Sequence, residues 1–216
     1  MVCLAVGAVD IPLAAVFDIL VGNTEGYEDS WIFIIMESRL PATVTAFVSG
    51  MSLAVSGLLL QTVFQNPLAG PSVFGVNSGA SLAVSILMLT AGGSLSAFSS
   101  TLGGQMAVVV AAVIGASAVM FIIIGISAIV RSNVMLLIIG MMIGYLASSA
   151  ISILSYFASE DGLQAYTIWG LGTFSNTTND QMPVFLAASL LPAAVALFCI
   201  KPLNAFMLGD NYATTL

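Results

Sequence analysis

The 216-residue chain is 59% hydrophobic and 6% charged, with a mean hydropathy of +1.11. An ordinary soluble domain is about 25% charged, and no Asp, Glu, Lys or Arg occurs here between Arg39 and Arg131. This composition excludes a soluble domain and predicts a single all-α, polytopic transmembrane bundle over residues 1–216, with the lipid bilayer as its surroundings.

The residue inventory also excludes most catalytic chemistry. There is no histidine, Cys3 and Cys199 both lie in apolar sequence, and no GxxxxGK[ST] phosphate loop occurs. Zinc and haem ligand sets, histidine-dependent triads and P-loop nucleotide binding are therefore missing. We expect no enzyme activity, no metal site, no cofactor and no nucleic-acid partner.

The N-terminal residues Met1–Val9 would form about 14 Å of helix, which is too short to cross a membrane. They lack the basic region and cleavage site of a signal peptide. We interpret them as the end of a helix whose beginning is missing.

Five charge-free runs are long enough to cross a hydrocarbon core of about 30 Å, at roughly 20 residues each. They are Pro41–Phe64, Ser72–Ala91, Met106–Val130, Val134–Phe157 and Met182–Ile200.

Positive residues set the predicted topology. Arg131 and Lys201 follow two of these runs and fit the inner side, which leaves Arg39 outside as the exception. Two outer segments follow: an acidic loop from Asp10 to Glu37, and Ser159–Asn179. The aromatic residues of the second segment, Tyr166, Trp169 and Phe174, suit either a short interfacial helix or an ordinary loop.

Two features inside the runs indicate helix packing or a pathway. Gly140, Gly144 and Ser148 form a stripe of small residues that either packs helices together or lines a path. Asn66-Pro67 interrupts apolar sequence, and irregular backbone at membrane depth is tolerated where protein or water covers it. That break therefore predicts a cavity or a gate.

The predicted spans carry no ionisable group, which argues against proton coupling. Sodium coupling through carbonyls and hydroxyls stays open, but energy supplied by another subunit is favoured. At the chain end, Asp210 occupies a predicted N-cap, and the residues after it form either a short docking helix or a frayed terminus.

Several short motifs, taken together and in order, carry a resemblance to a known family. They are Arg39-Leu40-Pro41, LAVSGLLLQ ending at Gln61, Asn66-Pro67-Leu68-Ala69 with Pro71, Gly75-Val76-Asn77-Ser78-Gly79-Ala80, LLIIG ending at Gly140, and Leu208-Gly209-Asp210. The chain resembles the FecCD-like permease subunits of binding-protein-dependent ABC importers for iron siderophores, haem and cobalamin.

The resemblance implies the N-terminal part, about two-thirds, of a ten-helix type II importer permease, with helix one truncated and the chain stopping at the coupling segment. It implies a multi-pass protein of the bacterial cytoplasmic membrane. The implied partners are a second permease copy, a cytoplasmic ATPase dimer and an extracytoplasmic binding protein.

The resemblance also implies roles for particular residues. Arg39 would dock the binding protein, while Ala42 stands where the family has a second arginine and Gly70 where it has a carboxylate. The implied inner gate comprises Asn66, Pro67, Leu68, Ser132, Asn133 and Val134. The implied ATPase-coupling residues are Leu208, Gly209, Asp210, Ala213 and Thr214.

The sequence therefore predicts a permease subunit that moves a metal chelate inward with ATP hydrolysed by a partner. The alternatives are a sodium-coupled carrier or passive channel, or a membrane fragment that transports nothing.

Overall fold

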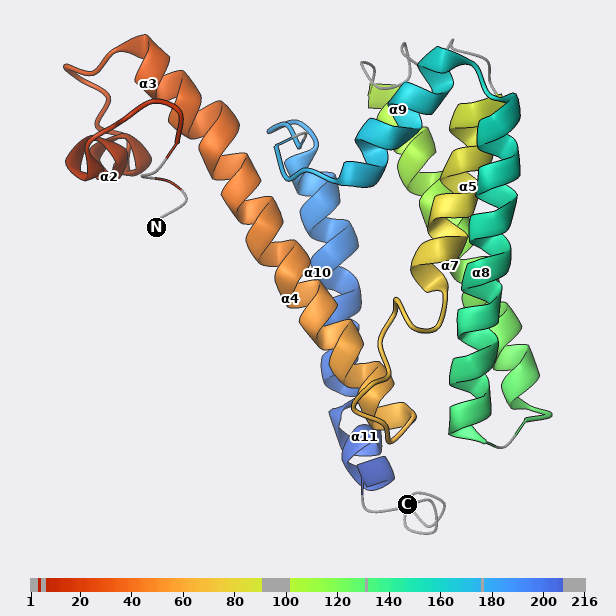
Figure 1. The fold of residues 1–216 in the computed structure, drawn as a ribbon. Coiled ribbons are helices and arrows are strands. Elements are labelled where there is room, and N and C mark those ends of the chain that lie inside the picture. Colours follow the sequence, from red (N-terminus) through yellow and green to blue (C-terminus); the bar gives the residue numbers. More distant parts are fainter. Residues whose placement is uncertain (1–3, 5–6, 91–101, 131, 176, 208–216) are drawn as a thin grey trace. The chain divides into compact units, whose positions relative to one another are not determined.

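The computed structural model describes residues 4, 7–90, 102–130, 132–175 and 177–207 (Figure 1). All secondary-structure elements assigned within these ranges are helices, which confirms the predicted all-α class. The chain divides into two compact units. The first comprises residues 1–55 and 173–201, and the second residues 56–172 and 202–216. That all 216 residues act as one permease domain stays a prediction.

Three helices in the described ranges are long and apolar enough to cross a membrane: Asp29–Val63, Gly103–Ser127 and Asn133–Phe157. They include α4 (Leu40–Val63), most of α7 (Leu102–Ser127) and α8 (Asn133–Phe157). Two further apolar helices, α5 (Val76–Thr90) and α10 (Met182–Phe198), have 15 and 17 residues and are shorter than predicted. α5 begins late because residues 71–75 form turns that end at Gly75, whose φ is +71°.

The acidic N-terminal stretch contains helices that the sequence analysis did not predict, and its position as an outer segment stays a prediction. It contains α2 (Leu13–Val21), α3 (Asp29–Phe33) and a π-helix, η1 (Ile34–Arg39), that continues into α4. The apolar segment LAAVFDILV forms a helix because packing against its neighbours outweighs one internal charge. In contrast, residues 7–9 form a bend, so the helix predicted over Met1–Val9 does not reach Val9.

A small apolar core holds α2 against η1 in the first unit. Its buried residues are Leu4, Ile11, Ala15, Val16, Ile19 and Ile35. Beside it, the Tyr27 hydroxyl donates a hydrogen bond of 2.6 Å to the Asp18 carboxylate. That hydrogen bond, with burial and the carboxylate's charge, raises the pKa of Tyr27 above its ordinary value. The one acidic side chain of α2 is thereby engaged within the unit.

The π-helix has a local cause in Pro41, the second residue of α4. In an α-helix the proline ring collides with the carbonyl four residues earlier, and proline has no N–H to donate. Widening the preceding turn to π geometry relieves that collision. In π spacing the Met36 carbonyl would accept from residue 41, which here cannot donate. Asn179, just before α10, supplies the missing donor, because its Nδ2 donates a hydrogen bond of 3.2 Å to the Met36 carbonyl.

This explanation predicts a coupling between Asn179 and Pro41. We expect Asn179→Ala to destabilise the protein by about 1 kcal/mol, the usual net value of one hydrogen bond. In a Pro41→Ala background the same change should cost much less, because residue 41 then supplies the missing N–H. Thermal unfolding in detergent of the four proteins of this double-mutant cycle measures the coupling. Equal costs in both backgrounds would contradict the explanation.

The second unit is organised around α5, which packs against α7, α8 and α9 (Figure 1). Glycines permit the close contacts. A Cβ on Gly79 would lie 2.6 Å from the Gly115 carbonyl of α7, and a Cβ on Gly140 of α8 would lie 2.7 Å from the Phe74 Cα. Backbones meet at these points, which is how helices pack tightly when lipid supplies no hydrophobic driving force.

The segment after α8 contains the predicted short helix, α9 (Glu160–Leu171). Ser159 caps it by accepting a hydrogen bond of 3.3 Å from the Gly162 N–H. Tyr166 and Trp169 stack with ring centroids 6.0 Å apart and pack on the cluster of Val84, Met88 and Val108, whereas Phe174 lies beyond the helix. The position of α9 at a membrane surface stays a prediction.

Candidate functional site

The break after α4 is a defined helix ending. Gln65 has a φ of +45°. The Asn66 N–H donates to the Gln61 carbonyl at 3.0 Å, and the Gln65 N–H donates to the Thr62 carbonyl at 3.2 Å. This is the Schellman pattern, with Gln65 in the left-handed position that glycine usually takes. The helix therefore stops here by a specific arrangement rather than by fraying.

Side chains then fix the turn that follows. The Asn66 Oδ1 accepts from the Leu68 N–H at 2.9 Å, which is the hydrogen bond expected of asparagine in a turn. The Gln61 Nε2 reaches forward and donates to the Pro67 carbonyl at 3.0 Å. Leu68 is 77% exposed at this turn. The predicted gate residues Asn66, Pro67 and Leu68 thus form one ordered turn that presents an apolar side chain.

The second predicted gate segment lies against this turn. Ser132 caps α8 by accepting from the Met135 N–H at 3.4 Å, and Val134 is exposed. Between them, the Asn133 Nδ2 donates to the Phe64 carbonyl at 3.0 Å. Phe64 directly follows the last residue of α4, and backbone carbonyls at the end of a helix have no hydrogen-bond partner within it. The structure therefore brings together two segments separated by 69 positions in the chain.

An aromatic pair supports the turn. The rings of Phe64 and Phe74 lie 4.3 Å apart, and Phe74 is 1% exposed in a cluster that includes Leu136 and Leu137 of α8. The sequence analysis missed the roles of Gln61, Phe64 and Phe74, although Gln61 stands inside one of the quoted motifs. The two phenylalanines carry no signal that distinguishes them from other apolar residues of the run.

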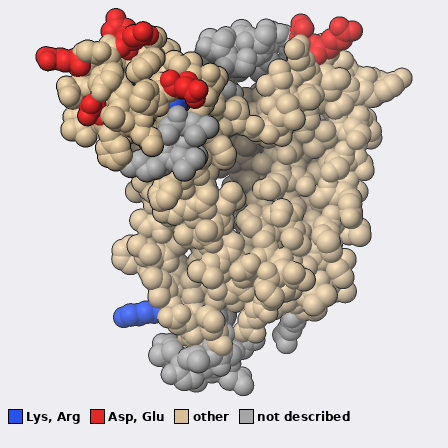
Figure 2. Space-filling view, turned by 60° about the vertical axis from the view of Figure 1, so that its left-hand side comes forward, with Lys and Arg blue, Asp and Glu red and all other residues tan. Residues whose placement is uncertain are grey.

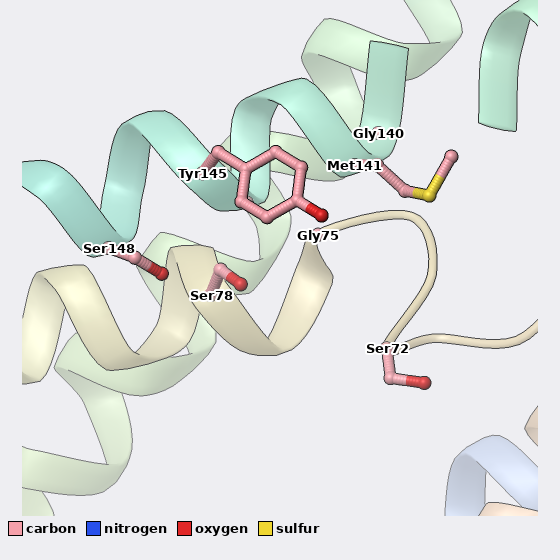
Figure 3. Close-up of a pocket in the computed structure, with 8 residues that line it drawn as sticks. Ser72, Gly75, Ser78, Gly140, Met141, Tyr145 and Ser148 are labelled. Atoms are coloured by element: carbon pink, nitrogen blue, oxygen red, sulfur yellow. The ribbon is translucent and has the colours of Figure 1, made fainter. Parts of the chain in front are cut away.

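A shallow hollow of about 210 Å³ lies where the start of α5 meets α8. Figure 3 shows the hydroxyl groups around it. Its lining residues are Ser72, Gly75, Ser78, Gly140, Met141, Gly144, Tyr145 and Ser148. The hydroxyls of Ser72, Ser78, Tyr145 and Ser148 have no hydrogen-bond partner within the described part of the chain.

The small-residue stripe on α8 both packs against neighbouring backbone and lines the hollow. Gly140 meets the backbone of Phe74, while a Cβ on Gly144 would lie 3.3 Å from the Ser78 Oγ. Ser148, one turn further along, lines the hollow. The sequence analysis named these three residues but missed their hydroxyl neighbours Ser78 and Tyr145.

A second hollow, of about 400 Å³, lies beside the turn. It is lined by Leu58, Gln61, Thr62, Gln65, Asn66, Pro67 and Met207. Met207 ends α11 (Ile200–Met207) and is the last described residue. The predicted coupling residues Leu208, Gly209, Asp210, Ala213 and Thr214 lie outside the described residues, as does Arg131.

Arg39 is directed at the N-terminal segment of its own chain. It is 9% exposed, its Nη1 donates to the Leu4 carbonyl at 2.8 Å, and its Nη2 donates to the Val9 carbonyl at 2.5 Å. A Cβ on Gly7 would lie 2.5 Å from Nη2, so the chain passes closely over the guanidinium. The geometry gives Arg39 an internal role in holding the N-terminal segment, and its role in docking stays a prediction.

The described residues contain no group of three or more His, Cys, Asp or Glu side chains that could hold a metal ion. The site is thus one of hydroxyls, amides and backbone carbonyls on apolar helices.

Comparison with known proteins identifies the family to which the chain belongs. Residues 1–216 match the model of the FecCD transport family, so the chain belongs to that family and the resemblance drawn from the motifs is confirmed. Its relatives are permease proteins of import systems, which places it among transport components rather than enzymes.

Three curated relatives show the range of cargo. The vitamin B12 permease BtuC of Vibrio parahaemolyticus is 34% identical over 85% of this chain and 53% of its own length. The hemin permease HmuU of Yersinia pestis is 30% identical over 99% and 62%. The molybdate permease MolB of Haemophilus influenzae is 31% identical over 85% and 52%. The chain spans about half to three-fifths of their lengths.

A solved structure supports the fold. A chain of an inward-facing ABC transporter of the metal-chelate type matches with a TM-score of 0.77 and 24% identity, over 99% of this chain and 62% of that chain. The chain therefore shares the fold of part of that transporter chain.

The contact between the two gate segments yields a prediction. We expect Asn133→Ala to speed amide hydrogen exchange in the turn after α4, because the Phe64 carbonyl loses its partner and the turn loses its anchor on α8. Hydrogen exchange read by mass spectrometry measures this. Val134→Ala, at the exposed neighbouring residue, is the control and should leave exchange unchanged. Unchanged exchange in Asn133→Ala would show that the hydrogen bond does not hold the turn.

Proposed function

We propose that this chain serves as a membrane-spanning permease subunit of a bacterial ABC importer that carries a metal-containing substrate inward across the cytoplasmic membrane. The observation that carries the proposal is the FecCD family match over residues 1–216, joined to a gate-like turn that two distant segments build together. The cargoes that the relatives' names give, vitamin B12, hemin and molybdate, support a metal-containing substrate. An iron–siderophore chelate is a further candidate from the motifs.

The polar hollow fits a passage wall in this proposal. Hydroxyl groups that lack partners are costly against hydrocarbon, but they are favourable where water or a polar substrate can reach them. Ser72 and Ser78 at the start of α5, with Tyr145 and Ser148 on α8, would then face the passage. The Asn66–Leu68 turn and the start of α8 would close its inner end.

The energy in this proposal comes from a cytoplasmic ATPase dimer, and the substrate from an extracytoplasmic binding protein. A second permease copy completes the passage. The described parts of the spans support an external energy source, since α4, α5, α7, α8 and α10 contain no Asp, Glu, Lys or Arg that could couple protons.

Reconstitution tests the proposal. We expect proteoliposomes that hold the complete permease with its ATPase to take up one labelled substrate among cobalamin, haemin, a ferric siderophore and molybdate. Uptake should require the binding protein and ATP on the ATPase side, and it should not respond to a sodium gradient. An ATPase variant that cannot hydrolyse ATP is the control. Uptake that persists without ATP would contradict the proposal.

Arg39 offers a separate test of docking. We expect Arg39→Glu to lower the affinity for the binding protein without changing membrane insertion, because it removes a positive charge and releases the carbonyls of Leu4 and Val9. Gly7→Ala should disturb the same contact without a change in charge. Titration of the binding protein against permease in nanodiscs gives both affinities, with Ser38→Ala as the control.

The two variants separate two mechanisms. A loss of affinity in Arg39→Glu alone would assign a direct charge contact, and a loss in both would assign a positioning role through the N-terminal segment. Unchanged affinity in Arg39→Glu would remove Arg39 from the docking surface.

A further inference from the structure

One face of α2 has no partner in the described chain. Ala15, Val16 and Ile19 are buried in the small core of the first unit, but Leu13, Phe17 and Val21 are 61%, 54% and 82% exposed. These three residues are spaced by four positions and therefore lie along one side of the helix. We call Leu13, Phe17 and Val21 the α2 stripe.

The α2 stripe carries no charge. Asp18 is the only ionisable residue in α2, and its carboxylate accepts the hydrogen bond from the Tyr27 hydroxyl. The other acidic residues of the stretch flank the helix in sequence, with Asp10 before it and Glu25, Glu28, Asp29 and Glu37 after it. Acidic side chains gather at the surface of this segment (Figure 2). Charge thus surrounds an apolar face that remains uncovered.

The position of α2 along the helix that continues into α4 gives its depth. The charge-free span begins at Leu40, and α2 packs on Ile35, five residues or about 7 Å earlier. The headgroup layer is roughly 5–8 Å deep on each side of the hydrocarbon core. Leu40 itself packs against the same apolar core. Once α4 crosses the membrane, α2 therefore lies at the level of the lipid headgroups.

Aromatic residues mark the same level. Tyr27 and Trp31 pack against this core, with ring centroids 6.4 Å apart. Tyr and Trp concentrate at the boundary between headgroups and acyl chains, because one end of each side chain is apolar and the other polar. Nine residues give α2 a length of about 14 Å, which suits a helix that lies within the boundary rather than one that crosses the core.

We propose that α2 is an interfacial helix that inserts Leu13, Phe17 and Val21 into the acyl boundary of the membrane. The acidic residues at its ends favour neutral, zwitterionic headgroups over anionic ones. Such a contact fixes the depth of the N-terminal end of the α4 helix, together with the Arg39 contact that holds the segment before α2. The inference concerns lipid contact alone and stands or falls separately from transport.

Spin labelling of the whole chain in phosphatidylcholine vesicles tests the inference. Nitroxides are attached to Phe17→Cys and, in a second protein, to Val21→Cys, in a Cys3→Ser, Cys199→Ser background. Collision with oxygen, which partitions into lipid, is compared with collision with a water-soluble nickel chelate. We expect both labels to meet oxygen more than nickel. Glu25→Cys, in the loop after α2, is the matched control and should show the reverse.

Two results would overturn the inference. If the labels at residues 17 and 21 meet nickel as often as the label at residue 25, the stripe faces water. If they meet neither reagent, protein covers the stripe, either from a second copy or from another segment. Neither measurement involves an ATPase, a binding protein or a substrate, so the outcome is independent of the proposed function.

Discussion

Backbone carbonyls that lose their helical partners near a membrane must find donors inside the protein, since hydrocarbon offers none. Three long polar side chains serve this purpose here. Asn179 bonds to the Met36 carbonyl, which Pro41 cannot serve; Asn133 bonds to the Phe64 carbonyl at the end of α4; and Arg39 bonds to the carbonyls of Leu4 and Val9. Each of these hydrogen bonds joins segments at least 30 positions apart. The bonds that give the backbone carbonyls their partners therefore also hold distant segments together within each unit.

Within the second unit, small residues complement these bonds. The contacts of Gly79 with Gly115 and of Gly140 with Phe74 bring α5 against α7 and α8 at backbone distance. The hydroxyl-lined hollow lies next to that contact, and the turn from Gln61 to Leu68 is anchored on α8 by Asn133. The hydroxyl-lined hollow and the anchored turn, which presents the exposed side chain of Leu68, are therefore both held by contacts with α8.

One residue near Arg39 departs from the pattern that the resemblance implies. The resemblance implies a second arginine where this chain has Ala42, and Arg39 is buried against its own N-terminal segment. If this face receives a binding protein, the charge available to it differs from the pattern that the motifs alone suggested. Acidic residues, rather than basic ones, dominate the exposed surface of this stretch.

The sequence by itself determined the membrane class, the approximate positions of the five apolar helices, the break at Asn66-Pro67 and the family. These depend on composition, on charge-free length and on short motifs, all of which are local. It did not predict the helices within residues 10–37, which form where Val16 and Ile19 are buried against Ile35.

Only the tertiary structure decided which carbonyls accept hydrogen bonds from Arg39, Asn133 and Asn179. It also decided that Gly140 packs on Phe74 beside a hollow that Ser148 lines as well, and that the α2 stripe is uncovered. The physical reason is that the hydrogen bonds join residues from 30 to 143 positions apart, and that packing and exposure depend on which helices meet, which no local pattern encodes.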